Sequence, residues 1–183
     1  LEQLPADLRK QIETTYRNSK GELSMKAFFD LLALHELGHA FHQQGGLKMH
    51  RNWMGELFCN ILLHTYIAEN EPEQLPALTV FPNMVIAGGT KEYKFTALQD
   101  VEERYEEIGK YHAKNYGWYQ CRWHKSAGDI YEAGGKELVT KLWKALQQQQ
   151  TSLTNEKLLL FLDSAGAKPV ADMVRNWERD MKR

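Results

Sequence analysis

Hydrophobic side chains recur at intervals of three and four residues along most of the chain, which is the spacing of one face of an α-helix. The pattern predicts helices over residues 5–17, 24–44, 52–69, 101–115, 116–133, 136–150, 156–165 and 170–179. One stretch differs. From Leu75 to Phe95, prolines and glycines separate short β-prone pieces, which is typical of a small hairpin or an irregular loop. We therefore expect a mainly α fold with at most a small β-hairpin.

Several predicted helix ends carry residues with known capping preferences. Ser24, Asn52 and Thr154 can each accept a backbone hydrogen bond at a helix N-terminus. Gly45 and Gly46 can end the second helix and reverse the chain. These signals separate the second and third predicted helices by a short turn.

Composition describes an ordinary globular chain of 183 residues, of which 43% are hydrophobic. Its 23 Lys and Arg against 24 Asp and Glu give a formal net charge of −1, so nothing favours attraction to a nucleic-acid backbone. The acidic run at 102–107 is expected to be a solvated helix face. We expect no nucleic-acid partner and one domain over residues 1–183, with possible lobes over 1–96 and 97–183.

Neither the cysteines nor the apolar segments suggest export or a membrane. Cys59 and Cys121 form no CxxC pair and are expected to be buried free thiols. No window holds the roughly 18 uninterrupted apolar residues of a membrane span, and the first ten residues lack the order of a signal peptide. We expect no membrane partner and favour the cytoplasm. Because the chain begins at Leu1 rather than at a methionine, the sequence leaves open whether a further segment lies upstream.

Residues 35–39 form the motif H-E-x-x-H within the second predicted helix. His35 and His39 lie one turn apart on the same helix face, so both imidazoles can reach one zinc ion. Glu36 points to the side, toward a water on the metal. The motif therefore predicts a zinc site with Glu36 as the general base of a hydrolytic reaction.

A catalytic zinc site takes three protein ligands and leaves one position open. Glu56 fits the third place, because it follows His39 after sixteen intervening residues and the glycine turn between them can bring the next helix alongside. Asn60 stands one turn further along that helix. Its side-chain oxygen can accept the proton of a liganding histidine's outer nitrogen and so fix the tautomer.

Other histidines are weaker candidates for the third ligand. His42 lies seven residues after His35, about 10 Å along a straight helix, which is too far for both to reach one tetrahedral ion. We expect His42 to be structural, and also His64 and His112. His50, just after the glycine turn, stays open as the second choice.

The segment from Phe28 to Ile67 resembles the zincin metallopeptidases, in the gluzincin branch whose third zinc ligand is a glutamate on a following helix. HELGH at 35–39 with ELFCN at 56–60 is similar to the pairing of HELGH with ExxAN in the ImmA/IrrE-type metallopeptidases. The same pair of segments also resembles thermolysin-like enzymes, in which the liganding glutamate is followed by an acidic residue that supports the ligands. Cys59 stands where the ExxAN pattern has a small residue.

The resemblance implies a zincin-like helical zinc metallopeptidase that acts on a peptide or protein substrate. It implies His35, His39 and Glu56 as zinc ligands and Glu36 as the general base. Zinc lowers the pKa of water and polarises the scissile carbonyl, while the base takes the water proton and delivers it to the leaving amine.

A hydrolase of this kind also needs a donor for the developing oxyanion, which a downstream tyrosine or histidine supplies in related enzymes. The aromatic segment 116–131 offers Tyr116, Tyr119 and His124, and we favour Tyr119 or His124. Aromatic residues at helical spacing mainly pack in cores, so most of this segment is expected to be core. The cleft is expected between the motif helix and this aromatic helix.

Two other functions fit the same residues. A non-catalytic helical interaction module would keep zinc as a structural or vestigial centre with four protein ligands, whereas an open position occupied by water indicates an enzyme. A regulatory protease would cut one partner protein and not peptides in general. Comparing unstructured casein with candidate repressors as substrates distinguishes the regulatory protease from a broad peptidase.

Overall fold

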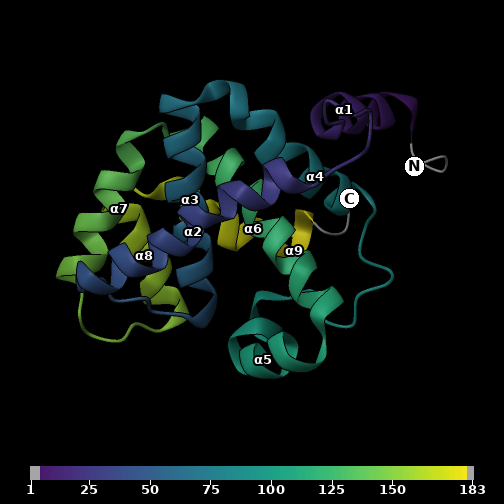
Figure 1. Cartoon of the computed structure of the whole chain (residues 1–183). Coiled ribbons are helices and arrows are strands. Elements are labelled where there is room, and N and C mark those ends of the chain that lie inside the picture. The colour runs from purple at the N-terminus through teal and green to yellow at the C-terminus, as the bar shows by residue number, and fades with distance from the viewer. Residues whose placement is uncertain (1–4, 181–183) are drawn as a thin grey trace.

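The computed structural model describes residues 5–180, and within that range every regular element is a helix (Figure 1). The mainly α prediction is confirmed. Residues 1–4, which begin the stretch without signal-peptide order, lie outside the described residues. The elements are α1 (Ala6–Tyr16), α2 (Lys26–Gln44), α3 (Asn52–Asn70), η1 (Pro72–Gln74), α4 (Leu75–Ala87), α5 (Leu98–Tyr111), α6 (Ala113–Gly134), α7 (Glu137–Gln148), α8 (Asn155–Ser164) and α9 (Lys168–Asp180).

The hairpin prediction was wrong, because most of its segment is the helix α4. Leu78 and Pro82 are buried on this helix, which packs against α6 and α1. Burial of an apolar face outweighs the weak β preference of the individual residues. Only the part after α4, residues 88–97, lacks regular structure as expected.

A tyrosine from α1 supports α4 next to its internal proline. The Tyr16 hydroxyl donates to the Ala77 carbonyl (2.8 Å) and accepts the Phe81 N–H (3.0 Å), so it stands between two groups that bond directly in a regular helix. Pro82 has no N–H to offer the Leu78 carbonyl. Burial raises the pKa of Tyr16 to about 12, so the hydroxyl keeps its proton. Tyr16 therefore joins α1 to α4 where the backbone ladder is weakest.

Helix α3 forms the centre of the molecule. Eleven of its nineteen residues are buried, and it packs against α2, α5, α6 and α7. In Figure 1, α2 lies across the front of α3 and α6 lies beside it. A helix that is apolar nearly all round belongs in the interior. The two helices that carry the sequence motif are therefore in direct contact.

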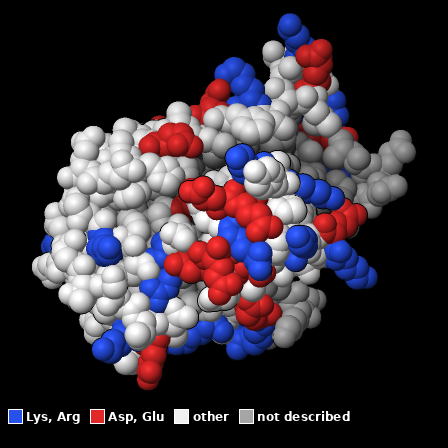
Figure 2. Space-filling view, turned by 90° about the horizontal axis from the view of Figure 1, so that it is seen from below, with Lys and Arg blue, Asp and Glu red and all other residues white. Residues whose placement is uncertain are grey.

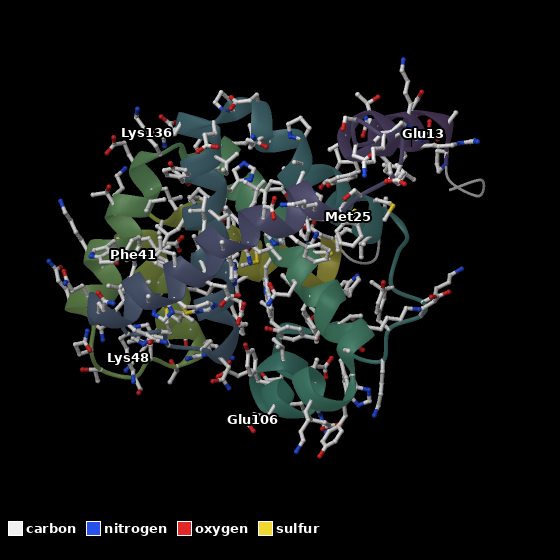
Figure 3. All side chains as sticks on the ribbon, in the orientation of Figure 1. Glu13, Met25, Phe41, Lys48, Glu106 and Lys136 are labelled. Atoms are coloured by element: carbon white, nitrogen blue, oxygen red, sulfur yellow. The ribbon has the colours of Figure 1, made fainter. Side chains whose placement is uncertain are left out.

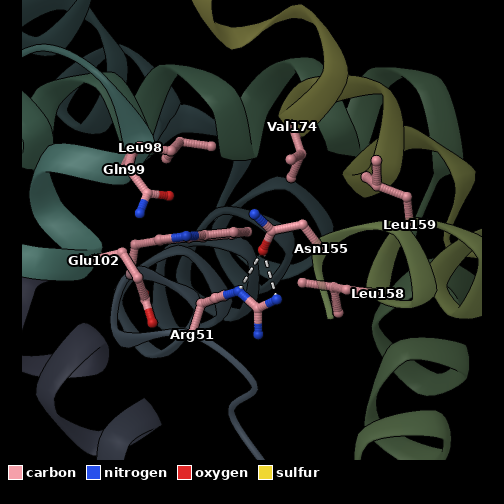
Figure 4. Close-up of a pocket in the computed structure, with 9 residues that line it drawn as sticks. Arg51, Leu98, Gln99, Glu102, Asn155, Leu158, Leu159 and Val174 are labelled. Carbon is pink, nitrogen blue, oxygen red and sulfur yellow. Dashed lines mark hydrogen bonds between the residues drawn. The ribbon is translucent and has the colours of Figure 1, made fainter. Parts of the chain in front are cut away.

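The start of α3 is fixed by residues from α5, by the first residue of α8 and by the segment just before it (Figure 4). Arg51 donates to the Asn155 side-chain oxygen from two guanidinium nitrogens (2.9 and 2.6 Å) and to the Leu153 carbonyl (2.9 Å). The Asn52 N–H donates to the Glu102 carboxylate (2.7 Å). Asn52 is thus the first helical residue and not the predicted cap. The carboxylate that satisfies the helix end comes from α5 instead, which no local pattern could predict.

Two other capping predictions have clear outcomes. The Thr154 hydroxyl accepts the Lys157 N–H (3.3 Å), so its role at α8 is confirmed. The Ser24 hydroxyl accepts the Lys26 N–H (3.3 Å), but the N-cap position of α2 is Met25, so the predicted cap was wrong by one residue.

Charged residues of both signs are interspersed on the lower face, where α5 faces the viewer in Figure 2. Arg104 and Glu107 on α5 form an ion pair of 3.1 Å. This agrees with a solvated helix face for the acidic run, with Glu102 as the exception. In the described part of the chain, no helix combines the length and apolar character that crossing a membrane requires.

Candidate metal centre

Helices α2 and α3 bring together the two motif histidines and the predicted third ligand. His35 Nε2 lies 3.2 Å from Glu56 Oε2 and 3.2 Å from His39 Nε2, and His39 Nε2 lies 3.8 Å from Glu56 Oε2. Ligand atoms at about 2.0–2.1 Å from a tetrahedral zinc ion stand about 3.3 Å from one another. The three atoms already have nearly the spacing that one ion requires, so the residues can hold a metal.

Donors from α5 and α6 surround the Glu56 carboxylate on its other sides. The Tyr105 hydroxyl donates to Oε1 (2.6 Å), Gln120 Nε2 donates to Oε2 (2.8 Å), and the Tyr116 hydroxyl lies 3.5 Å from Oε1. Burial alone would raise the pKa of Glu56, but hydrogen bonds from His35, Gln120 and Tyr105 outweigh it and lower the pKa to about 2. The buried carboxylate is therefore ionised, as a cation ligand must be.

His42 supplies a partner for the other ring nitrogen of His39. His39 Nδ1 lies 3.3 Å from His42 Nε2. Burial lowers the pKa of His42, and the neighbouring His39 lowers it further, so His42 is neutral and can accept a proton donated by Nδ1. Such a bond leaves Nε2 of His39 free to face the cluster. His42, which the sequence suggested to be structural, therefore contacts a candidate ligand directly.

A glycine inside the motif lets α2 and α3 approach closely. A Cβ atom added to Gly38 would lie 3.2 Å from both Cβ and Sγ of Cys59 and 3.3 Å from its Cα. These distances are tighter than ordinary contacts between carbon and its neighbours. The small residue within HELGH and the residue Cys59 within ELFCN thus set the separation of the two helices that hold the ligands.

Gly38→Ala is expected to lower the free energy of unfolding by about 1–3 kcal/mol, because the added methyl group overpacks the contact with Cys59. Gly109→Ala on α5 is the matched control. A Cβ there meets nothing within 4 Å, so that variant should be unchanged or up to about 1 kcal/mol more stable. Urea unfolding measures both. If Gly38→Ala were as stable as the parent chain, α2 and α3 would have to accommodate the added methyl group without cost at this contact.

The candidate ligands form one wall of a pocket of about 470 Å³. Glu36, which is exposed, and His124 also line it. The rest of the wall is mainly apolar and comes from α2, α4 and α6. Its apolar members are Phe28, Phe29, Leu32 and Phe81. Phe41, which is labelled in Figure 3, also lies on α2 but is 49% exposed and does not line this pocket.

The two residues favoured as oxyanion donors separate in the structure. Burial lowers the pKa of His124 to about 3, so its ring is neutral, and it lies beside His35 with ring centroids 6.3 Å apart. Tyr119 is not at the pocket, and that prediction needs correction. Its ring stacks on Trp123 and Trp177, and its hydroxyl donates to the Ala97 carbonyl (2.8 Å). Helical rotation turns Tyr119 into the core while Tyr116 faces the site.

Asn60 and His50 do not make the contacts that were considered for them. Asn60 donates from its amide nitrogen to the Glu56 carbonyl (2.9 Å), while its oxygen bonds no histidine. That oxygen and His35 Nδ1 are both buried without a hydrogen-bond partner among residues 5–180. His50 packs against Phe161 and belongs to neither group of potential metal ligands in the described range. His50 is therefore not the third ligand of this cluster.

Sequence reasoning missed Tyr105 and Gln120. Tyr105 follows a break in α5 at Arg104 (φ −128°, ψ 25°), and Gln120 lies among aromatic residues that suggested only packing. The one available signal was that Tyr116 and Gln120 are four residues apart on a helix face.

In comparisons with known proteins, no family model, no curated protein and no solved structure matches this chain.

Proposed function

We propose that the chain is a zinc-dependent metallopeptidase of the gluzincin type, with His35, His39 and Glu56 as ligands. The observation that carries this proposal is the spacing of three ligand atoms, which all lie within 4.8 Å of one another at the wall of a pocket. The donor set also fits the ion. Two imidazoles and an ionised carboxylate are the ligands of a catalytic zinc site, and the carboxylate is held by hydrogen bonds from outside the cluster.

Bound zinc would lower the pKa of water and polarise a substrate carbonyl. Glu36 has no hydrogen-bond partner among the described side chains and lines the pocket beside both histidines. Its carboxylate is therefore free to take a proton from the attacking water and to deliver it to the leaving amine. Tyr116 and His124 line the same pocket and are the candidate donors to the oxyanion. Tyr105 and Gln120 hold the carboxylate of Glu56 in place.

The position of the cluster favours an enzyme over a structural zinc module. A structural site closes around its ion with four protein ligands, whereas this cluster has three and faces a pocket of about 470 Å³. The apolar wall made by Phe28, Leu32 and Phe81 suits a bulky apolar side chain next to the scissile bond.

The test combines elemental analysis with a mixture of unstructured peptides. We expect about one zinc ion per chain, cleavage beside bulky apolar residues, and loss of cleavage after chelation that returns when zinc is added. Casein and candidate repressor proteins, used in parallel, separate a broad peptidase from a protease specific for one partner. A purified chain that binds no zinc at micromolar concentration would overturn the proposal.

His42→Ala is expected to weaken zinc binding roughly 10–100-fold, because His39 loses the partner that fixes its tautomer. The matched control is His50→Ala, another buried histidine that lies against Phe161 and away from the cluster. Zinc affinity is measured by competition with a chromogenic chelator, and a melting curve without metal checks the fold of each variant. Equal losses in the two variants would assign the effect to general destabilisation.

A further inference from the structure

His39 belongs to two groups of potential metal ligands at once. The second group consists of His39, His42 and Cys59, and one ligand atom from each lies within 4.8 Å of the others. The His39 nitrogen nearest His42 is Nδ1 (3.3 Å), which is the opposite side of the ring from the nitrogen that faces His35. The imidazole of His39 thus stands between two sets of donors.

The second group differs from the first in chemistry and burial. It offers two nitrogens and a sulfur where the first offers two nitrogens and an oxygen. Cys59 is fully buried and His42 is 8% exposed, while His39 also lines the pocket. The residues packed against this group are small, because Gly38 faces Cys59 and Gly55 lies beside His42, where an added Cβ would be 3.8 Å from Nε2.

We propose that His39, His42 and Cys59 form a second metal position, which takes a thiophilic ion such as Cd²⁺ or Cu⁺. Thiolate with imidazole ligands selects such soft ions, whereas the carboxylate of the first position suits zinc. Binding breaks the S–H bond of Cys59, forms a bond from sulfur to the ion, and releases the proton to solvent.

The two positions compete, a consequence that rests on the proposed function of the first. A neutral imidazole has one lone pair, so an ion bound at Nδ1 of His39 leaves the proton on Nε2. The ring then cannot also bind an ion between His35 and Glu56. A soft ion would therefore inhibit the enzyme by withdrawing His39 from the first position.

The test is to add Cd²⁺ to the metal-free full chain and to record the ultraviolet charge-transfer absorption of a cadmium–thiolate bond. We expect this absorption to reach a plateau at about one ion per chain and to vanish in Cys59→Ser. In His42→Ala, the Cd²⁺ concentration that gives half of this absorption should be at least tenfold higher. The matched control is Cys121→Ser, which removes the other buried free thiol and should leave the absorption unchanged.

Each contrary result has a distinct meaning. An absorption that is absent from the parent chain, that depends on Cys121, or that is unaffected by His42→Ala overturns the second position. Glu56→Gln tests the first position separately, because it should weaken zinc binding and leave the cadmium–thiolate absorption intact. If zinc binding were insensitive to Glu56→Gln while the absorption behaved as expected, the second position would stand and the proposed function would fall.

Discussion

Glu36→Gln is expected to lower peptide hydrolysis about 10²–10⁴-fold while the zinc content stays at that of the parent chain. Glutamine has the shape of glutamate but cannot take a proton from water. Glu36 contributes no atom to either group of potential metal ligands, so the cluster should survive the change. The measurements are the initial rate of peptide cleavage and the zinc content of the same preparation.

Asp30→Asn provides the control for Glu36→Gln. Asp30 is an exposed carboxylate on the same helix, paired with Lys26 and absent from the pocket wall. Its loss should leave the cleavage rate within about twofold, since surface ion pairs contribute little. Full activity in Glu36→Gln would remove Glu36 as the base and would redirect attention to another group at the pocket.

Glu56→Ala is expected to remove most of the bound zinc and all measurable activity. The variant loses one of three ligands and the only charged one, and zinc held by the two histidines alone should dissociate readily. It also leaves the Tyr105 hydroxyl and the Gln120 amide without their acceptor, which costs about 1–3 kcal/mol of stability. Equilibrium dialysis against zinc, followed by elemental analysis, measures the loss.

Glu56→Gln separates the metal from the fold. The amide keeps the volume of the carboxylate and can still accept a hydrogen bond from Tyr105, so the chain should remain folded by circular dichroism. Zinc affinity should nevertheless fall, because the ligand no longer carries a charge. Unchanged zinc occupancy in both Glu56 variants would mean that the ion is bound elsewhere, and the group of His39, His42 and Cys59 would be the first place to look.

The helical character of the chain followed from its periodicity because three- and four-residue spacing is a local property. The exception, α4, shows where such reasoning fails. Residues 75–87 contain two prolines and β-branched residues, yet they are helical because α6 and α1 cover them and Tyr16 bridges the gap near Pro82. A hydroxyl supplied by another helix has no counterpart in the local pattern.

The candidate site also has a part that local spacing predicts and a part that depends on contacts between helices. His35, Glu36 and His39 could be proposed from five consecutive residues, because helical spacing alone places the two imidazoles one turn apart. Glu56 could be proposed from the length of chain that separates it from His39 and from the glycine turn within that length. The preference for Tyr119 over Tyr116 was wrong, because the choice between them depends on the rotation of α6 about its axis, which packing against α3 and α4 determines.

By itself, the sequence determined the mainly helical class, the pair of histidines on one helix face and the glutamate that follows them, because each depends on spacing along the chain. Only the tertiary structure decided that Tyr105 and Gln120 hold that glutamate, that His42 faces the second nitrogen of His39, and that Cys59 meets Gly38. Apart from His39 and His42, which lie three residues apart on α2, these contacts join residues of different helices. Their geometry is set by how α2, α3, α5 and α6 pack, which is a property of the whole fold.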